Sequence, residues 1–242
     1  MYRKIGILGG LSPESTVTYY LHIVRKYQNL FGNHNYPEII IYSVSFQKFI
    51  DWMNENRWDK IAEELIKGIR KLAMAGADFA LIATNTMHIV FHEVERASPI
   101  PLISIVDATA EAIKKENINI VGLLGTLFTM EKNFYKDGLA KYGIKTLIPE
   151  KSDREYINNV IFKELCRGLI QEETRNNFKR IIKKLTEMGA EGVVLGCTEL
   201  SLLIDEKDVS TKIFDTATLH AEKALNLAIK PEFKLKFNRH LN

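Results

Sequence analysis

The sequence predicts an α/β fold with two pseudo-symmetric domains, each built on a four-stranded parallel sheet flanked by helices. Two observations support this prediction. Short β-branched runs alternate with longer amphipathic stretches, and landmarks of the first half recur in the second. The 242 residues are enough for two packed domains with separate cores. Charged residues make up 26% of the chain with both signs interspersed, which is typical of a globular protein.

Eight short apolar runs are expected to form the strands. In chain order they are Lys4–Leu8, Glu38–Tyr42, Ala80–Ala83, Leu102–Ile105, Ile118–Leu124, Lys145–Ile148, Gly192–Leu195 and Lys212–Phe214. Helical periodicity is clearest in Trp58–Ala75, where apolar residues recur three and four positions apart. Arg180–Met188 repeats this pattern, and a last helix is predicted from Thr216 to about Ala228.

Three pairs of matching segments, in the same order, indicate a duplication. Residues 75–86 (AGADFALIATNT) align without a gap to residues 188–199 (MGAEGVVLGCTE), which pairs Thr84 with Cys197 at an offset of 197 − 84 = 113. GILGG at 6–10 matches GLLGT at 122–126, and residues 107–109 resemble residues 215–217. We therefore expect one domain from residues 1–106 plus 216–242 and a second from residues 107–215.

The duplication also predicts where a ligand binds. Ligands of parallel sheets bind beyond the carboxyl ends of the strands. Thr84 and Cys197 both fall at predicted strand ends. The active site is therefore expected in the interdomain cleft, with these two residues on opposite walls.

The composition of the chain indicates which kinds of partner and which compartment to expect. Lys plus Arg exceed Asp plus Glu by only 33 to 30, so a small anion is expected as partner rather than nucleic acid. The start MYRKIGILGG lacks the pattern of a signal peptide, and no apolar run is long enough to span a membrane. The two cysteines form no disulfide framework, which predicts a cytoplasmic protein with reduced thiols. The charged tail after Pro231 is expected to be peripheral.

The segment GGLSPEST at 9–16 has two interpretations. Ser12, Pro13 and Glu14 are the residues with which a helix begins: a hydroxyl N-cap, proline at the first position and an acid in the first turn. The same backbone N–H groups could also cradle a carboxylate. Nucleotide binding is disfavoured because neither G-x-G-x-x-G nor G-K-[ST] is present.

Cys197 is the first candidate for acid/base chemistry. A lone buried cysteine is usually a packing residue, but this one pairs with Thr84 in the duplication. A following helix N-terminus is expected to lower the thiol pKa toward neutrality, where the group could both take and return a proton. Cys166 lies in the helical pattern FKELCRG and is interpreted as structural.

Thr84 is harder to interpret because an alcohol is a much weaker acid than a thiol. It could cap the next helix, or relay a proton with help from water or an ionisable neighbour such as His88. His88 and His92 have the i, i+4 spacing of metal ligands, but H-E-x-x-H is absent and no third ligand is evident. No metal and no other cofactor is therefore expected.

Several motifs together carry a family resemblance. They are GGLSPEST at 9–16, TNTMH at 84–88, LLGT at 123–126, GCTEL at 196–200 and FDTA at 214–217. With them, nearly the whole chain resembles the aspartate/glutamate racemase family. This resemblance implies a pseudo-symmetric two-domain fold, a possible homodimer, and racemisation without pyridoxal phosphate by two opposed cysteines. The family's C-N-T is T-N-T here, so Thr84 stands at the first cysteine and Cys197 at the second, as in the atypical Thr/Cys branch.

The resemblance also implies roles for other residues. Hydroxyl and amide groups would hold the substrate's α-carboxylate and amino group; these are Ser12, Asn85, Thr86, Thr126 and Thr198. Lys48 and Arg167 are the nearest matches to the basic residues that hold the side-chain carboxylate in aspartate-selective relatives.

The expected function is a racemase that interconverts L and D aspartate or glutamate, with Cys197 and Thr84 as its catalytic residues. Two alternatives stay open. One is a superfamily decarboxylase or isomerase that uses Cys197 alone, and the other is a non-catalytic amino-acid-binding protein. A thiol hydrolase is disfavoured because no histidine is obviously paired with Cys197.

Overall fold

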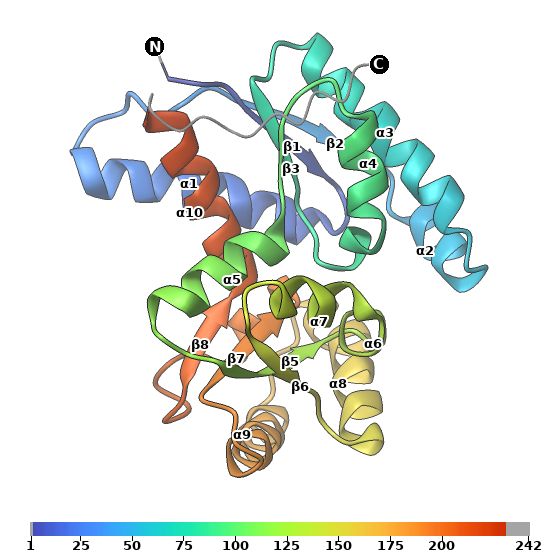
Figure 1. Ribbon diagram of the computed structural model, residues 1–242, viewed down its shortest axis with the longest axis vertical. Helices are drawn as coiled ribbons and strands as arrows, with labels where there is room; N and C mark the ends of the chain where they lie inside the picture. Colours follow the sequence, from blue (N-terminus) through green and yellow to red (C-terminus); the bar gives the residue numbers. More distant parts are fainter. Residues whose placement is uncertain (1, 231–242) are drawn as a thin grey trace. The chain divides into compact units, whose positions relative to one another are not determined.

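The computed structural model describes residues 2–230, which divide into two compact units (Figure 1). Unit 1 contains the chain up to Ala83, Val90–Ser104 and the chain from Ala221 onward, and unit 2 contains Thr84–Ile89 and Ile105–His220. The boundaries predicted at 106/107 and 215/216 stay a prediction. The tail after Pro231 lies outside the described residues.

Unit 1 is built on a parallel sheet with the strand order β2-β1-β3-β4. Its strands are β1 (Ile5–Gly9), β2 (Ile39–Ser43), β3 (Phe79–Ile82) and β4 (Leu102–Ile103). Its helices are α1 (Pro13–Phe31), α2 (Gln47–Asn54), α3 (Trp58–Met74) and α4 (Phe91–Ala97). Figure 1 shows α1 and α3 on opposite sides of this sheet.

Unit 2 repeats the arrangement with the order β6-β5-β7-β8, again with every pairing parallel. Its strands are β5 (Ile120–Gly125), β6 (Lys145–Leu147), β7 (Gly192–Gly196) and β8 (Lys212–Asp215). Its α-helices are α5 (Ile105–Lys115), α6 (Leu127–Glu131), α7 (Asn133–Ala140), α8 (Lys151–Lys163) and α9 (Glu172–Glu187). Three short 3-10 helices are η1 (Thr86–Val90), η2 (Leu165–Arg167) and η3 (Thr198–Leu202), and α10 (Thr216–Ile229) follows β8.

The predicted fold of two four-stranded parallel sheets flanked by helices is confirmed, and the offsets read from the sequence recur in the strands. β3 begins at Phe79 and β7 at Gly192, an offset of 192 − 79 = 113. β1 ends at Gly9 and β5 at Gly125, an offset of 125 − 9 = 116. Most of the predicted strand bounds differ from the observed ones by one or two residues. One of these differences places a residue in another element: Ile105 begins α5, because β4 has only two residues before the chain turns into that helix.

Alternation along the strands gives unit 2 its layers. Val121 and Leu123 of β5 and Val194 of β7 pack on the side of α5 and α7. The intervening Val193 and Leu195 pack with α8 and α9 on the other side. Successive strand side chains point to opposite faces, so both faces of this sheet are covered by helices and its strands read as nearly continuous apolar runs.

Unit 1 confirms the predicted start of its first helix. Ser12 caps α1, because its Oγ accepts a hydrogen bond from the Ser15 backbone N–H at 3.3 Å, and Pro13 is the first helical residue. Gly10 precedes the cap with a φ of +82°, a left-handed conformation that favours glycine. Among the helices in residues 2–230, none combines the length and hydropathy needed to cross a membrane.

Candidate functional site

The carboxyl ends of three neighbouring strands of unit 2 bring polar residues to one edge of the sheet. Thr126 follows β5, Cys197 follows β7 and Thr216 follows β8. The last residues of β5 and β7, Gly125 and Gly196, are paired in register. A Cβ atom on Gly196 would lie 2.9 Å from the Leu124 carbonyl oxygen, so glycine lets the ends of these two strands approach closely. This edge is where a parallel sheet binds its ligands.

The loop Thr84–Ile89 belongs to this unit and is tied to that edge by side chains. Asn85 Nδ2 donates to Thr216 Oγ1 at 3.0 Å, and the hydroxyl oxygens of Thr86 and Thr126 lie 3.3 Å apart. Thr126 also caps α6 by accepting from the Thr129 N–H at 3.3 Å. Three of the predicted substrate-binding residues, Asn85, Thr86 and Thr126, therefore take part in the two sets of hydrogen bonds that tie this loop to the ends of β5 and β8.

Thr84 is held in this loop by its backbone. Its carbonyl oxygen accepts from His88 Nδ1 at 2.8 Å, whereas within residues 2–230 no hydrogen bond engages its hydroxyl. Asn85 and Thr86 use their side chains to tie the loop down. The Thr84 hydroxyl is thus available for another partner.

His88 has both ring nitrogens occupied by backbone groups. Nε2 accepts from the Ile105 N–H at 3.1 Å, so this nitrogen carries no proton, and Nδ1 must be the atom that donates to the Thr84 carbonyl. His88 is therefore a neutral Nδ1–H imidazole that joins the Thr84 loop to the start of α5. It contacts the Thr84 carbonyl rather than the hydroxyl, which removes the support for His88 as a proton relay.

Cys197 is half-buried and faces a carboxylate. Its Sγ–H donates to Glu199 Oε2 at 3.0 Å, and the Thr198 hydroxyl donates to the same oxygen at 2.7 Å. Glu199 is buried, with 6% of its surface exposed. The side chains of Cys197 and Thr198 thus both turn to an acid that the sequence did not single out.

The expected lowering of the Cys197 pKa is wrong. Burial first, and then the Glu199 carboxylate, raise the pKa of the Cys197 thiol above its ordinary value, because both disfavour the thiolate. The helix that follows, η3, has only five residues and cannot offset these effects. In the free protein Cys197 is therefore a protonated thiol whose proton already points at a base.

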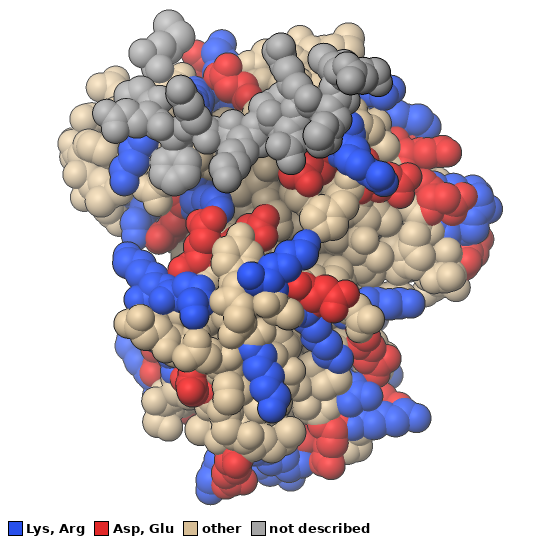
Figure 2. Space-filling model, in the orientation of Figure 1, with Lys and Arg blue, Asp and Glu red and all other residues tan. Residues whose placement is uncertain are grey.

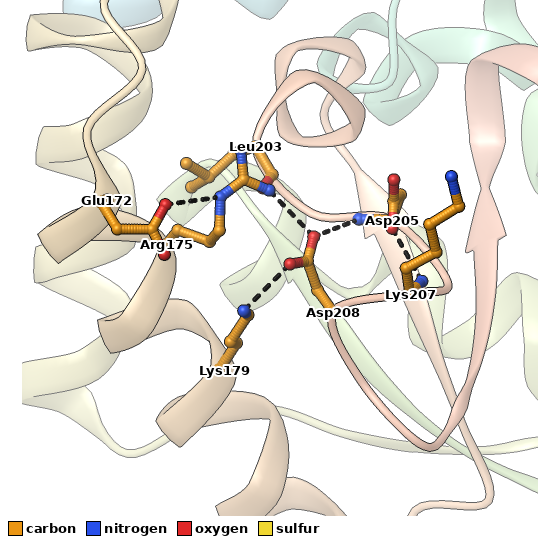
Figure 3. Close-up of polar contacts among 7 residues, drawn as sticks. All are labelled: Glu172, Arg175, Lys179, Leu203, Asp205, Lys207 and Asp208. Atoms are coloured by element: carbon orange, nitrogen blue, oxygen red, sulfur yellow. Dashed lines mark hydrogen bonds and ion pairs between the residues drawn. The ribbon is translucent and has the colours of Figure 1, made fainter.

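An ion-pair cluster holds the segment that follows η3 (Figure 3). Arg175 of α9 donates to the carbonyl oxygen of Leu203, the residue after η3, and pairs with Asp208 Oδ2 at 2.9 Å. Lys179 pairs with Asp208 Oδ1 at 3.0 Å. The Asp205 N–H, with Lys179 and Arg175, holds the pKa of Asp208 below its usual value. α9 thus fixes the end of the segment that carries Cys197.

The two predicted basic residues lie in different units. Arg167 is exposed on η2, which packs against η3, and its guanidinium forms no hydrogen bond or ion pair within the described residues. Lys48 of α2 belongs to unit 1, where it pairs with Glu64 and lies 5.6 Å from the centroid of the Phe49 ring. Ser12 also belongs to unit 1, at the carboxyl end of β1.

Sequence reasoning missed two residues at this site. Glu199 was visible as part of the GCTEL motif, but only the fold shows that its carboxylate accepts from the Cys197 thiol. Tyr135 donates to Asn85 Oδ1 at 2.7 Å across 50 residues of sequence, and no local sequence pattern predicts that contact.

The surface charges and the positions of the ionisable groups bear on whether the protein could bind nucleic acid or a metal ion. On the face shown in Figure 2, Lys and Arg side chains are interspersed with Asp and Glu rather than gathered in one patch. Within residues 2–230, His, Cys, Asp and Glu form no group of three that could hold a metal ion. His92 is exposed and pairs with Glu95 at 3.4 Å.

Several known proteins resemble this chain in sequence and in fold. The sequence profile of the family described as Asp/Glu/Hydantoin racemase matches residues 8–224. The crystal structure of an aspartate racemase homologue from Pyrococcus horikoshii is 40% identical, with a TM-score of 0.85 over 94% of this chain and 100% of that chain. The broad specificity amino-acid racemase RacX of Bacillus subtilis is 24% identical over 92% of this chain and 96% of that protein. Picrophilus torridus aspartate racemase shares the fold, with a TM-score of 0.76 at 21% identity over 93% of this chain and 94% of that chain.

Proposed function

Because this chain belongs to the Asp/Glu/Hydantoin racemase family, we propose that it interconverts the L and D forms of aspartate or glutamate. Racemases of this kind are isomerases: they remove the α-proton from one face of the amino acid and return a proton to the other. The observation that carries the proposal is the Cys197 thiol bonded to Glu199, in the same unit as the Thr84 loop. No metal or organic cofactor is part of the proposal.

Cys197 and Glu199 act together in the first step. A thiol with a raised pKa is a poor base by itself, so its proton passes from Sγ to Glu199 Oε2 as Sγ takes the proton from the substrate's α-carbon. The electron pair of the broken C–H bond stays on the substrate as a carbanion or enolate. In the reverse direction the same thiol donates its proton and recovers one from Glu199.

Thr84 acts on the opposite face. Its uncommitted hydroxyl donates a proton to the carbanion, water restores that proton, and the proton held by Glu199 returns to the solvent. A threonine alkoxide is costly near neutral pH, so Thr84 is a donor far more readily than a base. The two half-reactions are therefore unequal: the enantiomer whose α-hydrogen faces Cys197 exchanges that hydrogen with solvent faster than its mirror image does, although kcat/KM is the same in both directions because the equilibrium constant is unity.

The surrounding polar groups hold the substrate. We assign the α-carboxylate and amino group to Asn85, Thr86, Thr126, Thr198 and Ser12, because positioned donors stabilise the charge that develops during proton removal. Lys48 and Arg167 are proposed to bind the side-chain carboxylate. Arg167 is the simpler assignment, because Lys48 would have to leave its ion pair with Glu64 to bind the substrate. The homodimer and the predicted domain boundaries remain part of the same proposal.

Proton NMR in D2O tests the function directly. Incubation with L- or D-aspartate or glutamate should replace the α-hydrogen by deuterium and produce the mirror-image amino acid. Cys197→Ser should lower exchange by orders of magnitude, whereas Cys166→Ser, at the other half-buried cysteine, should not.

Other outcomes would redirect the proposal. Exchange of neutral or basic amino acids, with acidic ones inert, would overturn the substrate class. Binding of aspartate without exchange would support a sensor. Equal loss in both cysteine variants would show that Cys197→Ser acts through stability.

A further inference from the structure

A buried chain of hydrogen bonds runs from α7 to the strand that ends beside Cys197. The Tyr135 hydroxyl donates to Asn85 Oδ1 at 2.7 Å, and Asn85 Nδ2 donates to Thr216 Oγ1 at 3.0 Å. The Thr216 hydroxyl donates in turn to the Leu195 carbonyl oxygen at 2.8 Å. We name Tyr135, Asn85, Thr216 and this carbonyl the Asn85 network.

The carbonyl at its end fixes the direction of every bond. A carbonyl oxygen can only accept, so the Thr216 hydroxyl must spend its single proton on Leu195. Thr216 Oγ1 must then accept from Asn85, which turns the NH2 end of the amide toward Thr216 and the oxygen toward Tyr135. The Tyr135 hydroxyl is therefore the donor that satisfies Asn85 Oδ1.

We propose that Tyr135 is a positioning residue that fixes the orientation of the Asn85 amide and holds the Thr84 loop in register with the end of β7. The proposal deepens the racemase function above and rests on it for its catalytic consequence. Asn85 has two amide protons and gives one to Thr216, which leaves one N–H for an acidic substrate. An amide turned the other way would present an oxygen to that carboxylate.

Burial makes this arrangement rigid. Tyr135 and Thr216 are fully buried and Asn85 is 4% exposed, so water does not readily replace a lost partner. Burial also raises the pKa of Tyr135 far above its ordinary value, which keeps the phenol protonated and able to donate at any working pH. Tyr135 is thus a permanent donor and not an acid or base in the reaction.

Tyr135→Phe removes the hydroxyl and keeps the ring. Inversion of aspartate should fall about tenfold or more in kcat, because misplacing the Thr84 loop breaks the alignment that inversion needs. KM should rise as well, because a misoriented Asn85 amide no longer offers its N–H to the substrate's carboxylate. Deuterium exchange on the Cys197 face should fall much less than inversion, since that step does not use Thr84. Tyr142→Phe is the matched control: Tyr142 donates to Asp107 at 3.2 Å, outside the network, and its variant should keep wild-type rates.

A double-mutant cycle separates positioning from general destabilisation. If Tyr135 acts through Asn85, Tyr135→Phe should cause no further loss in an Asn85→Ala background. Thr216→Ser, which keeps the hydroxyl, should retain most of the inversion rate that Thr216→Val loses. Multiplicative losses in the cycle, or inversion and exchange falling in equal proportion, would overturn the proposal.

A readout without turnover tells failure of this proposal apart from failure of the function. In 15N NMR, Tyr135→Phe should shift the Asn85 side-chain amide signals and speed their exchange with solvent, and Tyr142→Phe should leave them unchanged. Unchanged Asn85 signals in Tyr135→Phe refute the positioning role whatever the activity. Shifted signals in a protein that exchanges no amino acid uphold the Tyr135–Asn85 bond and refute the racemase function with its catalytic consequence.

Discussion

Replacing Arg175 by methionine tests whether the ion-pair cluster of Figure 3 stabilises the segment that carries Cys197. The variant keeps most of the apolar stem but removes the donor to the Leu203 carbonyl and one partner of Asp208. The side chains of Arg175 and Asp208 are only 25% and 12% exposed, so water replaces these bonds poorly. Asp208 keeps Lys179 and the Asp205 N–H, which limits the damage.

The expected cost follows from those contacts. A hydrogen bond to a charged group contributes about 1.5–3 kcal/mol, so losing two partly buried ones while Asp208 keeps other partners should cost about 2–3 kcal/mol. For a chain of this size each kcal/mol shifts the melting temperature by about 2–4 °C, which gives a fall of about 4–12 °C. Urea unfolding followed by circular dichroism measures the free energy, and calorimetry measures the temperature.

Two results would contradict this reasoning. Arg57→Met removes an exposed bidentate pair with Asp59, at 2.9 and 2.7 Å, and should be hard to distinguish from wild type in stability. A loss of stability equal to that of Arg175→Met would show that burial is irrelevant.

The second result concerns the pH dependence of stability. The pKa of Asp208 is lowered in the folded state, so its contribution is complete well above 3.8 and is lost as the pH falls through the lower, folded value. The difference between wild type and Arg175→Met should therefore shrink in acid, and a difference that grew would refute the assignment.

Three further predictions concern the site and its support. Burial and, after it, the Glu199 carboxylate raise the Cys197 pKa; Glu199→Gln removes the second cause, so the rate of thiol alkylation by iodoacetamide should rise at lower pH than in wild type, and an unchanged profile would dismiss Glu199 as a contributor. Thr84→Ala should keep deuterium exchange for one enantiomer of aspartate while inversion nearly stops, and Thr84→Cys should make the exchange rates of the two enantiomers more alike; parental inversion in Thr84→Ala would assign the second proton to water. Gly10→Ala should destabilise by at least about 1 kcal/mol in urea, because its Cβ would lie 2.3 Å from the Val44 carbonyl oxygen; Gly32→Ala, also at positive φ but in open space, should cost less.

The sequence predicted those parts of the fold that local rules determine. The strands alternate with amphipathic helices, so their period and order follow from side-chain spacing. The offset of 113 correctly matched the starts of β3 and β7. The Ser12–Pro13 start of α1 was equally readable, because a cap needs only neighbouring residues.

The site could be predicted only in part, because its interactions join residues that are distant in the chain. Asn85 and Thr216 are hydrogen-bonded across 131 positions, and no periodicity records such a pair. The direction of the Cys197 pKa depends on burial and on where Glu199 turns its carboxylate, which a motif does not specify. Residue types were therefore easier to predict than their protonation.

The discontinuity of unit 1 has a consequence for synthesis on the ribosome. Lys26 of α1 pairs with Glu222 of α10 at 2.7 Å, and the Arg3 N–H donates to the Ala228 carbonyl at 3.1 Å. The ribosome makes Ile105–His220, nearly all of unit 2, before Glu222 and Ala228 of α10 emerge. The nascent chain must therefore hold most of unit 1, the part before Ile105, without α10 while unit 2 is made. Arg3 and Lys26 are thus made early but wait for α10, so unit 1 is completed only after unit 2 has been made, in contrast to strictly N-terminal-first co-translational folding.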